Sequence, residues 1–315
     1  MINTQTNRSF IEAQVQSQFI LRNLHDGLLP GAFYRDVSDF QNGETLNIPT
    51  IGEAKVQEVS EDSPLVYNPI ESGNVQLQVS DYVGDAYHVT DKFRQDSFAA
   101  EALLAARGQE STRAIQEYFE SRSLATLNAA QTNADANAIN GFAHRIASAA
   151  TNNVATIGHF SSMKLAFDKA QVPYAGRIAI VDPVVAATLQ NGFQGSYNVD
   201  SNPVLQGILE GGFSRDHEFV MNIFGWNIIT SNRLPKGAFS DGTTSIASGV
   251  ANIFMSVLDD QTKPLMVVWR QMPRVESERN KDLQRDEFVT TCRMGFGAQR
   301  VDTLGVLITS DSNVA

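Results

Sequence analysis

The sequence predicts an α+β protein in which an extended β-hairpin, a long helix and an α/β module follow one another along the chain. Val75, Leu77 and Val79 alternate with polar residues, which is the period of a half-buried strand. Residues 95 to about 131 are Ala-rich at first and then carry apolar side chains at helical spacing. The stretch GRIAIVDPVVAATLQ (176–190) combines an apolar run with a helix start.

The N-terminal part contains only a short amphipathic stretch before the hairpin begins. Its apolar residues are Phe10, Ile11, Val15, Phe19 and Ile20, and turn-rich sequence follows them. So few apolar side chains cannot form a core of their own. Residues 1–45 are therefore predicted to be an arm that lies on another surface.

Residues 46–90 are predicted to form a long two-stranded hairpin. Leu46, Ile48 and Ile51, followed by Val56 and Val59, mark its first strand, and the alternation around Leu77 marks its second. The loop SEDSPLVYNPIESG (60–73) contains two prolines and several acids. An isolated hairpin is marginal in water, so its apolar stripe packs either on its own domain or on a neighbouring subunit.

The helix over 95–131 carries Ile115, Tyr118 and Phe119 at helical spacing, and Gly108 is a candidate break or kink within it. A continuous helix of this length extends roughly 50 Å.

The α/β module spans residues 132–261, with a helix at Met163–Ala170 and strands at 224–235 and 249–260. Asp182 suits a helix N-cap and Pro183 the first helical position. A phosphate-binding turn needs glycines, and a carboxylate in its place repels an anion. The turn therefore favours a structural role over a cofactor site.

Strands return between 264 and 310, where Phe288, Thr290, Cys292, Met294 and Phe296 alternate with their neighbours. Residues 274–287 hold four basic and five acidic residues, and such a mixed run is typical of a solvated turn that can supply salt bridges to another subunit.

The composition is that of a folded protein of one large or two smaller domains, with 315 residues of which 42% are hydrophobic. A single cysteine excludes an internal disulfide and fits a reducing compartment. The chain shows no signal-peptide core and no apolar run of the ~20 residues that span a bilayer. We therefore expect a protein that is made and kept in a cytoplasm.

The net charge of −11 opposes a DNA-binding protein, which needs a concentrated basic surface. It is compatible with a protein that encloses nucleic acid, because an acidic wall does not hold the polymer.

No catalytic, cofactor or metal residue is predicted. Gly295-Phe296-Gly297 lacks a third glycine, Gly212-Phe213-Ser214-Arg215-Asp216 lacks the closing glycine of a nucleophile elbow, and Asp259-Asp260 suits a turn. Asn133, Asp135 and Asn137 have calcium-loop spacing, but Ala138 and His144 replace the required glycine and glutamate. The histidines are scattered without metal-ligand spacing, at His25, His88, His144, His159 and His217. Cys292 is predicted to be a core thiol.

The order of the elements and three local motifs resemble the major capsid proteins of tailed bacteriophages, the Hong Kong 97 fold. RIAIVDPVVAATLQ (177–190) is similar to the family's strand and Pro-started helix, and FGWNIITSNRLP (224–235) is similar to the strand that follows. Residues 274–310 are similar to the closing hairpin, whose second strand carries an arginine, Arg293. The resemblance covers residues 45–310.

The resemblance implies a structural shell protein and no enzyme. It divides the chain into an N-terminal arm (1–45), an E-loop hairpin (46–92), a P domain with a spine helix (93–155), an A domain (156–262) and C-terminal strands that complete the P domain (263–315). Hexamers and pentamers of identical subunits would close an icosahedral shell in the virion, made in the host cytoplasm.

The implied partners are a portal and packaged double-stranded DNA, which is enclosed without sequence-specific binding, and no membrane. Because the arm is too short to be a scaffold domain, a separate scaffolding protein is expected. Some family members cross-link a lysine to an asparagine; Lys55 lies in the hairpin, but a solvated lysine is the favoured interpretation.

Two alternatives come from other classes. The glycine-rich loops are compatible with an α/β enzyme or ligand-binding protein, and the second alternative is another virion structural protein, such as a tail or decoration component. Sedimentation and negative-stain microscopy separate a small discrete oligomer from shells or tubes.

Overall fold

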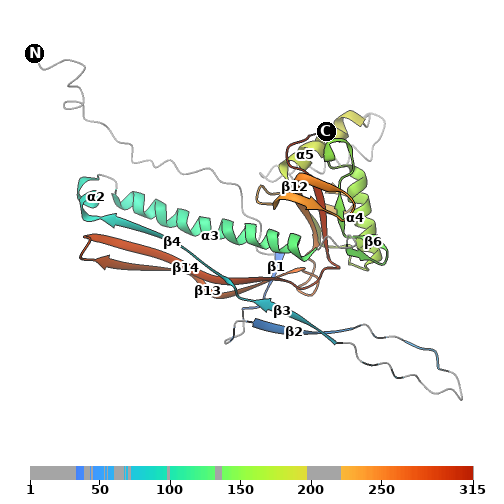
Figure 1. Ribbon diagram of the computed structural model, residues 1–315, viewed down its shortest axis with the longest axis horizontal. Coiled ribbons are helices and arrows are strands. Elements are labelled where there is room, and N and C mark those ends of the chain that lie inside the picture. The colour runs from blue at the N-terminus through green and yellow to red at the C-terminus, as the bar shows by residue number, and fades with distance from the viewer. Residues whose placement is uncertain are drawn as a thin grey trace, which may run out of the picture.

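The computed structural model of the chain places one long helix across two β-sheets (Figure 1). It describes residues 33–38, 43, 45–52, 54, 56–59, 67, 69, 72–97, 100–131, 137–196 and 221–314. Most of the N-terminal arm lies outside these residues, so the structure does not test its prediction.

The long helix α3 (Ala100–Ala130) continues through Gly108, so this candidate position is not a break in the helix. It begins later than residue 95 because Asp91–Asp96 forms a separate short helix, α2. The Thr90 hydroxyl accepts a hydrogen bond from the backbone N–H of Phe93 and caps α2.

Four strands form the small sheet, in the order β1 (Tyr34–Asp36), β13 (Leu265–Asn280), β14 (Arg285–Ala298) and β4 (Asp81–Thr90). Helix α3 covers one face, where Ile115 packs against Cys292 and Met294 of β14. Ion pairs from Arg107 to Asp85 (2.8 Å) and from Arg122 to Asp81 (2.9 Å) tie the helix to β4.

The charged segment 274–287 is mostly strand, which corrects the prediction of a turn. Strands β13 and β14 pair as far as Asn280 and Arg285, so only residues 281–284 turn the chain. Pairing places Arg279 opposite Asp286, and their side chains form an ion pair of 3.1 Å. Opposite charges on facing strands stabilise a sheet, so this pairing tolerates a charged sequence.

The predicted hairpin is confirmed in β2 (Thr45–Ile51) and β3 (Ser72–Gln78), which pair antiparallel from Thr45–Gln78 to Ile51–Ser72. Its predicted start agrees with the structure, but the length of its first strand and its C-terminal limit are wrong. Val56 and Val59 belong to no strand, and residues 81–90 form β4 of the small sheet. We call β2, β3 and the residues between them the hairpin.

Seven strands form the large sheet, in the order β7-β15-β12-β8-β10-β9, with β11 paired to β12. Their bounds are β7 (Arg145–Ala147), β15 (Leu304–Ser310), β12 (Ser245–Ser256), β8 (Arg177–Val181), β10 (Trp226–Thr230), β9 (Met221–Ile223) and β11 (Lys236–Ser240). Strands β7 and β15 lie outside residues 156–262, so the large sheet takes strands from both flanking segments. The remaining short elements are β5 (Ala138–Ile139), β6 (Phe142–Ala143) and a 3-10 turn at Thr151–Asn153.

Helices α4 (Ile157–Lys169) and α5 (Pro183–Ser196) pack on one face of the large sheet. The predicted N-cap is confirmed, because the Asp182 carboxylate accepts a hydrogen bond of 3.1 Å from the backbone N–H of Val184. Leu124 and Leu127 of α3 pack on the opposite face, against Ile180 and Ile253. Helix α3 therefore belongs to both cores.

Polar contacts fix α3 against the large sheet at two points. Arg233, after β10, pairs with Glu117 (3.1 Å) and Glu120 (3.5 Å) of the helix. At the helix end, buried Arg145 donates to the backbone oxygens of Gln131 (3.0 Å) and Ser240 (2.7 Å). A cation at the C-terminus of a helix satisfies its last carbonyls, so Arg145 also caps α3.

Candidate assembly surface

The residues considered for chemistry do not gather at one place. Among the described residues, no three His, Cys, Asp or Glu side chains are grouped as metal ligands. His25, His217, Asn133, Asp135, Lys55 and the segment 212–216 lie outside the described residues. His88 is exposed on β4, far along the chain from the others.

His144 and His159 have structural surroundings. His144 is fully buried, stacks on Phe167 and makes a 3.2 Å contact from Nδ1 to the carbonyl of Phe142. Its burial lowers the pKa. His159 closes a capping box, because its Nδ1 accepts from the backbone N–H of Thr156; burial lowers the pKa of this histidine too.

Cys292 is a buried thiol in the core beneath α3, as predicted, and burial raises its pKa. Asp259 and Asp260 lie in the turn after β12. The backbone N–H of Thr262 donates to the carbonyl of Asp259, and Asp260 pairs with Lys263 at 2.7 Å. The hydrogen bond from Lys263 is the main cause of the lowered pKa of Asp260.

Gly295 and Gly297 lie inside β14 and allow the base of the hairpin to cross the sheet closely. A Cβ at Gly295 would lie 2.6 Å from the carbonyl oxygen of Gln78, and one at Gly297 would lie 2.6 Å from Cδ1 of Leu77. Leu77 and Val79 are fully buried there, against Met266 and Val268 of β13. Sequence analysis missed this role; its signal was two glycines inside an alternating strand.

The hairpin tip, residues 51–71, differs from that base at its described residues, 51, 52, 54, 56–59, 67 and 69, which are all exposed. Ile51 is 82% exposed, Val56 98% and Tyr67 92%. Figure 1 shows β2 and β3 below the small sheet, away from the large one. Exposed apolar side chains on an extension with no core of its own are typical of a protein–protein contact.

The small sheet has an uncovered face on the side opposite α3. We define it by Tyr82, Gly84, Ala86 and His88 of β4 and by their partners on β14, which are Arg293, Thr291, Val289 and Glu287. Tyr82 is 65% exposed and Val289 39%. The base of the hairpin covers the same face where β14 reaches Gly295, so the uncovered face begins where that cover ends.

The far end of the small sheet is held by internal ion pairs. Arg279 pairs with Asp91 (2.6 Å) and Asp286 (3.1 Å), and Arg94 pairs with Asp286 (2.6 Å). The hydrogen bond from Arg279 lowers the pKa of Asp91. These charges therefore join α2 to the β13–β14 turn, whereas the sequence suggested pairs to another subunit.

The described residues of the hairpin tip and the uncovered face of the small sheet are therefore the two exposed surfaces considered for assembly. No described helix combines the length and the hydropathy that crossing a membrane requires.

Comparisons with known proteins agree on one family. A family model described as phage capsid protein matches residues 74–309. No curated protein matches the chain.

Solved capsid structures are similar over nearly the whole chain. The capsid of cyanophage P-SCSP1u superposes with a TM-score of 0.67 at 16% identity, covering 98% of this chain and 96% of that one. A structure from Mycobacterium phage Che8 has a TM-score of 0.62 at 14% identity, with 94% and 96% covered. One from Mycobacterium phage Adephagia has a TM-score of 0.60 at 15% identity, with 99% of each chain covered.

Proposed function

This chain belongs to the phage capsid protein family and is a structural major capsid protein with a Hong Kong 97-like fold, and from this premise we propose how its copies join. The hairpin tip of one subunit binds the uncovered face of a neighbour's small sheet. Repeated around hexamers and pentamers, this contact closes an icosahedral shell. The protein acts by assembly and is not an enzyme.

The parts of the chain take different places in that shell. The small sheet and α3 correspond to the P domain (93–155 and 263–315), and the hairpin lies within the E-loop (46–92), whose residues 81–90 join the small sheet as β4. Residues 156–262 are the A domain at the centres of hexamers and pentamers, with β7 and β15 added to its sheet.

One observation carries the proposal: the hairpin is buried at its base and exposed at its tip. Leu77 has no exposed surface, whereas Val56 is 98% exposed. The base fixes the direction in which the hairpin leaves the subunit, and the tip keeps its apolar side chains for a partner. Of the two surfaces expected for residues 46–90, the base of the hairpin uses its own domain, and we assign residues 51–71 to a neighbouring subunit.

The proposed partners follow from the net charge and from the family to which the chain belongs. The shell encloses double-stranded DNA without sequence-specific contacts, which suits a net charge of −11. A portal and a separate scaffolding protein complete assembly in the host cytoplasm, and residues 1–45 stay on the mature subunit. Intact-mass measurement of the subunit in mature particles tests the last point, since loss of those residues contradicts it.

The docking proposal is tested by shortening the hairpin while keeping its base. Replacing residues 52–71 by Asn-Gly joins Ile51 of β2 to Ser72 of β3 through a two-residue turn and keeps the Ile51–Ser72 pair. We expect a folded, soluble subunit that forms no shells in negative-stain microscopy. Shells of normal size from this variant would exclude the hairpin tip as the essential contact.

A milder variant separates apolar binding from length. Replacing Val56, Val59 and Tyr67 with serine removes the exposed apolar groups but keeps the chain length. The control is Glu58→Gln, which changes an exposed tip residue without changing apolar area. Shells should form with the control and not with the triple variant; equal assembly of both would contradict an apolar contact.

A further inference from the structure

The side chains that join α3 to the segment after β10 form one connected polar cluster. Arg233 pairs with Glu117 at 3.1 Å and with Glu120 at 3.5 Å. The Ser231 hydroxyl donates to the other carboxylate oxygen of Glu120 at 2.9 Å, and Arg113 pairs with Glu117 at 3.3 Å. We call Glu117, Glu120, Ser231 and Arg233 the clamp.

The clamp lies where α3 passes from one sheet to the other. Before it along the helix, Ile115 packs on β14 of the small sheet, and after it Leu124 and Leu127 pack on the large sheet. Leu234, which directly follows Arg233, is buried in the same cluster as these two leucines. Any rotation of the small sheet and α3 against the large sheet therefore changes the geometry of the clamp.

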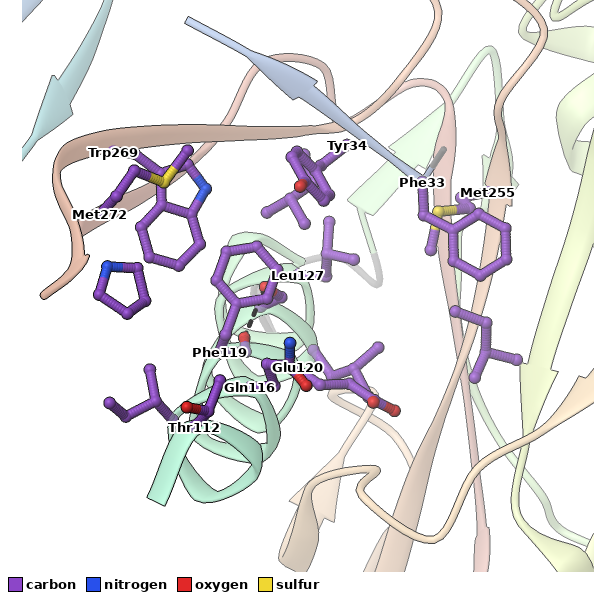
Figure 2. A pocket seen from close by; sticks show the side chains of 16 residues that line it. Phe33, Tyr34, Thr112, Gln116, Phe119, Glu120, Leu127, Met255, Trp269 and Met272 are labelled. Carbon is purple, nitrogen blue, oxygen red and sulfur yellow. Dashed lines mark hydrogen bonds between the residues drawn. The ribbon is translucent and has the colours of Figure 1, made fainter. Parts of the chain in front are cut away.

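Apolar packing beside the clamp is incomplete. A half-open cavity of about 380 Å³ lies along α3 between the two sheets. Figure 2 shows Glu120 at its border, with Tyr34 and Trp269 on the side of the small sheet and Met255 of β12 on the side of the large sheet. Close packing holds two elements in one position because each displacement meets other side chains. Across this cavity such contacts are missing, so the angle between the sheets depends on other interactions.

The clamp is better suited to fixing an angle than to adding stability. Glu120 is buried, and the side chain of Arg233 is only 13% exposed. Taking such charges out of water costs about as much free energy as their attraction contributes, so apolar replacement of a whole buried ion pair is often neutral. A guanidinium, however, is planar and donates in fixed directions. An arginine that holds two carboxylates at once therefore allows only a narrow range of positions.

We propose that Arg233 is a positioning residue, which acts through Glu117 and Glu120 to set the angle between the small and the large sheet and so the curvature of the shell. The inference rests on the proposed shell function, because the curvature of a shell is the tilt between neighbouring subunits. If both sheets contact neighbours, the angle between them fixes that tilt. A subunit without the clamp then allows several tilts, and its shells differ in diameter.

The first test measures the angle in the isolated full-length subunit and needs no shells. Cysteines replace Val275 of β13, which is 59% exposed, and Leu165 of α4, which is 45% exposed, in a Cys292→Ala background. Spin labels on the two cysteines give the distribution of distances between the sheets by pulsed electron paramagnetic resonance. The unmodified clamp should give one narrow distribution.

The decisive variant removes the clamp charges together. Glu117→Met/Glu120→Met/Arg233→Met takes away both carboxylates with their arginine, so Tm should stay within roughly 3 °C of the unmodified chain while the distance distribution broadens. The single variant Arg233→Met leaves the carboxylates without this arginine and should lower Tm by roughly 10 °C. The matched control is Arg122→Met, which breaks the ion pair of α3 with Asp81 inside the small-sheet layer and should not broaden the distribution.

The triple variant separates positioning from stability. A role limited to stability predicts that it behaves like the unmodified chain in both measurements, so an unchanged distance distribution would overturn the proposal.

The second test compares shells by negative-stain microscopy. The triple variant should give shells of mixed diameter, whereas Arg122→Met should give the diameter of the unmodified chain. Shells of that single diameter from the triple variant would also overturn the proposal. If the unmodified chain forms no shells, the proposed function fails, and the distance distribution still decides whether the clamp sets the angle.

Discussion

The large sheet and the small sheet are built from one chain yet differ in how completely they are covered. In the large sheet, β8 and β15 are buried at every residue, between α4 and α5 on one face and α3 on the other. In the small sheet, the far half of β13 is exposed, and Val89 is the one buried residue of β4. The difference shows that one region is stable through its own core, whereas the other leaves a face open for the neighbouring subunit that we propose.

The largest expected effect comes from opening the covered region. Phe254 is fully buried and meets Trp226 (4.9 Å) and Phe160 (5.2 Å) edge-on. Phe254→Ala should lower the free energy of unfolding by about 3–5 kcal/mol, because the lost contacts leave a cavity in a close-packed core. Urea titration followed by circular dichroism measures it.

The control for that variant is Val289→Ala on the uncovered face of the small sheet. It should change the free energy of unfolding of the isolated subunit by less than about 0.5 kcal/mol. Similar losses at the two positions would remove the distinction between the sheets.

A second variant attacks the joint between the small sheet and the hairpin. In Gly295→Ala the new Cβ would lie 2.6 Å from the carbonyl oxygen of Gln78 and 2.9 Å from Cα of Val79, which are backbone atoms that must shift. We expect a loss of roughly 1–3 kcal/mol and faster proteolytic cleavage within the hairpin. Gly158→Ala is the control, because its Cβ meets only Thr156 Oγ1, at 3.6 Å. Equal cleavage of both variants would contradict the close crossing.

The sequence could predict the parts of the fold that depend on local patterns. Alternating or capped stretches such as β3, β8 and α5 were predictable because strand period and N-cap chemistry are local. The order of strands was not, since β15 inserts between β7 and β12 from the far end of the chain. The close approach of Gly295 to Val79 also depends on tertiary contact alone.

The candidate surface was predictable in part for the same reason. The alternating apolar residues of the hairpin predicted it from the sequence, whereas no sequence pattern predicted the uncovered face of the small sheet. Its strands carry charge at 274–287 because water, not a core, contacts them before assembly, and a solvated strand has the composition of a turn. A sequence pattern alone does not distinguish a solvated strand from a turn, because it does not show the cross-strand pairs.

The two regions should differ in how acid affects their stability, because His144 is buried beside Phe167 in the covered region. Burial lowers its folded-state pKa below the ordinary 6.5, so the unfolded chain binds the proton more strongly. Stability from this group is present above pH 6.5 and is lost as the pH falls toward the folded pKa, by at most about 1.4 kcal/mol per pH unit.

The free energy of unfolding at pH 8 and pH 5 checks this prediction. His144→Gln should show a smaller loss between the two values than the unmodified chain, whereas His88→Gln, on the exposed side of β4, should not. The negative charge of nearby Asp302 raises the pKa of His144 and so partly opposes the effect of burial. An unchanged loss in His144→Gln would remove the buried histidine as the cause.

The smallest expected effect is that of a glycine-to-alanine substitution, which should change stability in opposite directions in the two regions. Gly108 lies inside α3 above β4, and an added Cβ there would meet only the Tyr87 hydroxyl, at 3.7 Å. Gly108→Ala should therefore stabilise the subunit by about 0.5–1 kcal/mol, since alanine loses less backbone entropy in a helix. Gly305→Ala, in β15 of the covered region, should destabilise it, because the Cβ would press on Met163 and lie 3.0 Å from Phe167. Thermal unfolding of the two isolated variants gives the sign of each change in stability.

If Gly108→Ala destabilises the isolated subunit, the helix does not run straight through this position in solution. If it stabilises the subunit but reduces shell yield, the helix bends there only in the shell, and the glycine is retained for that bend.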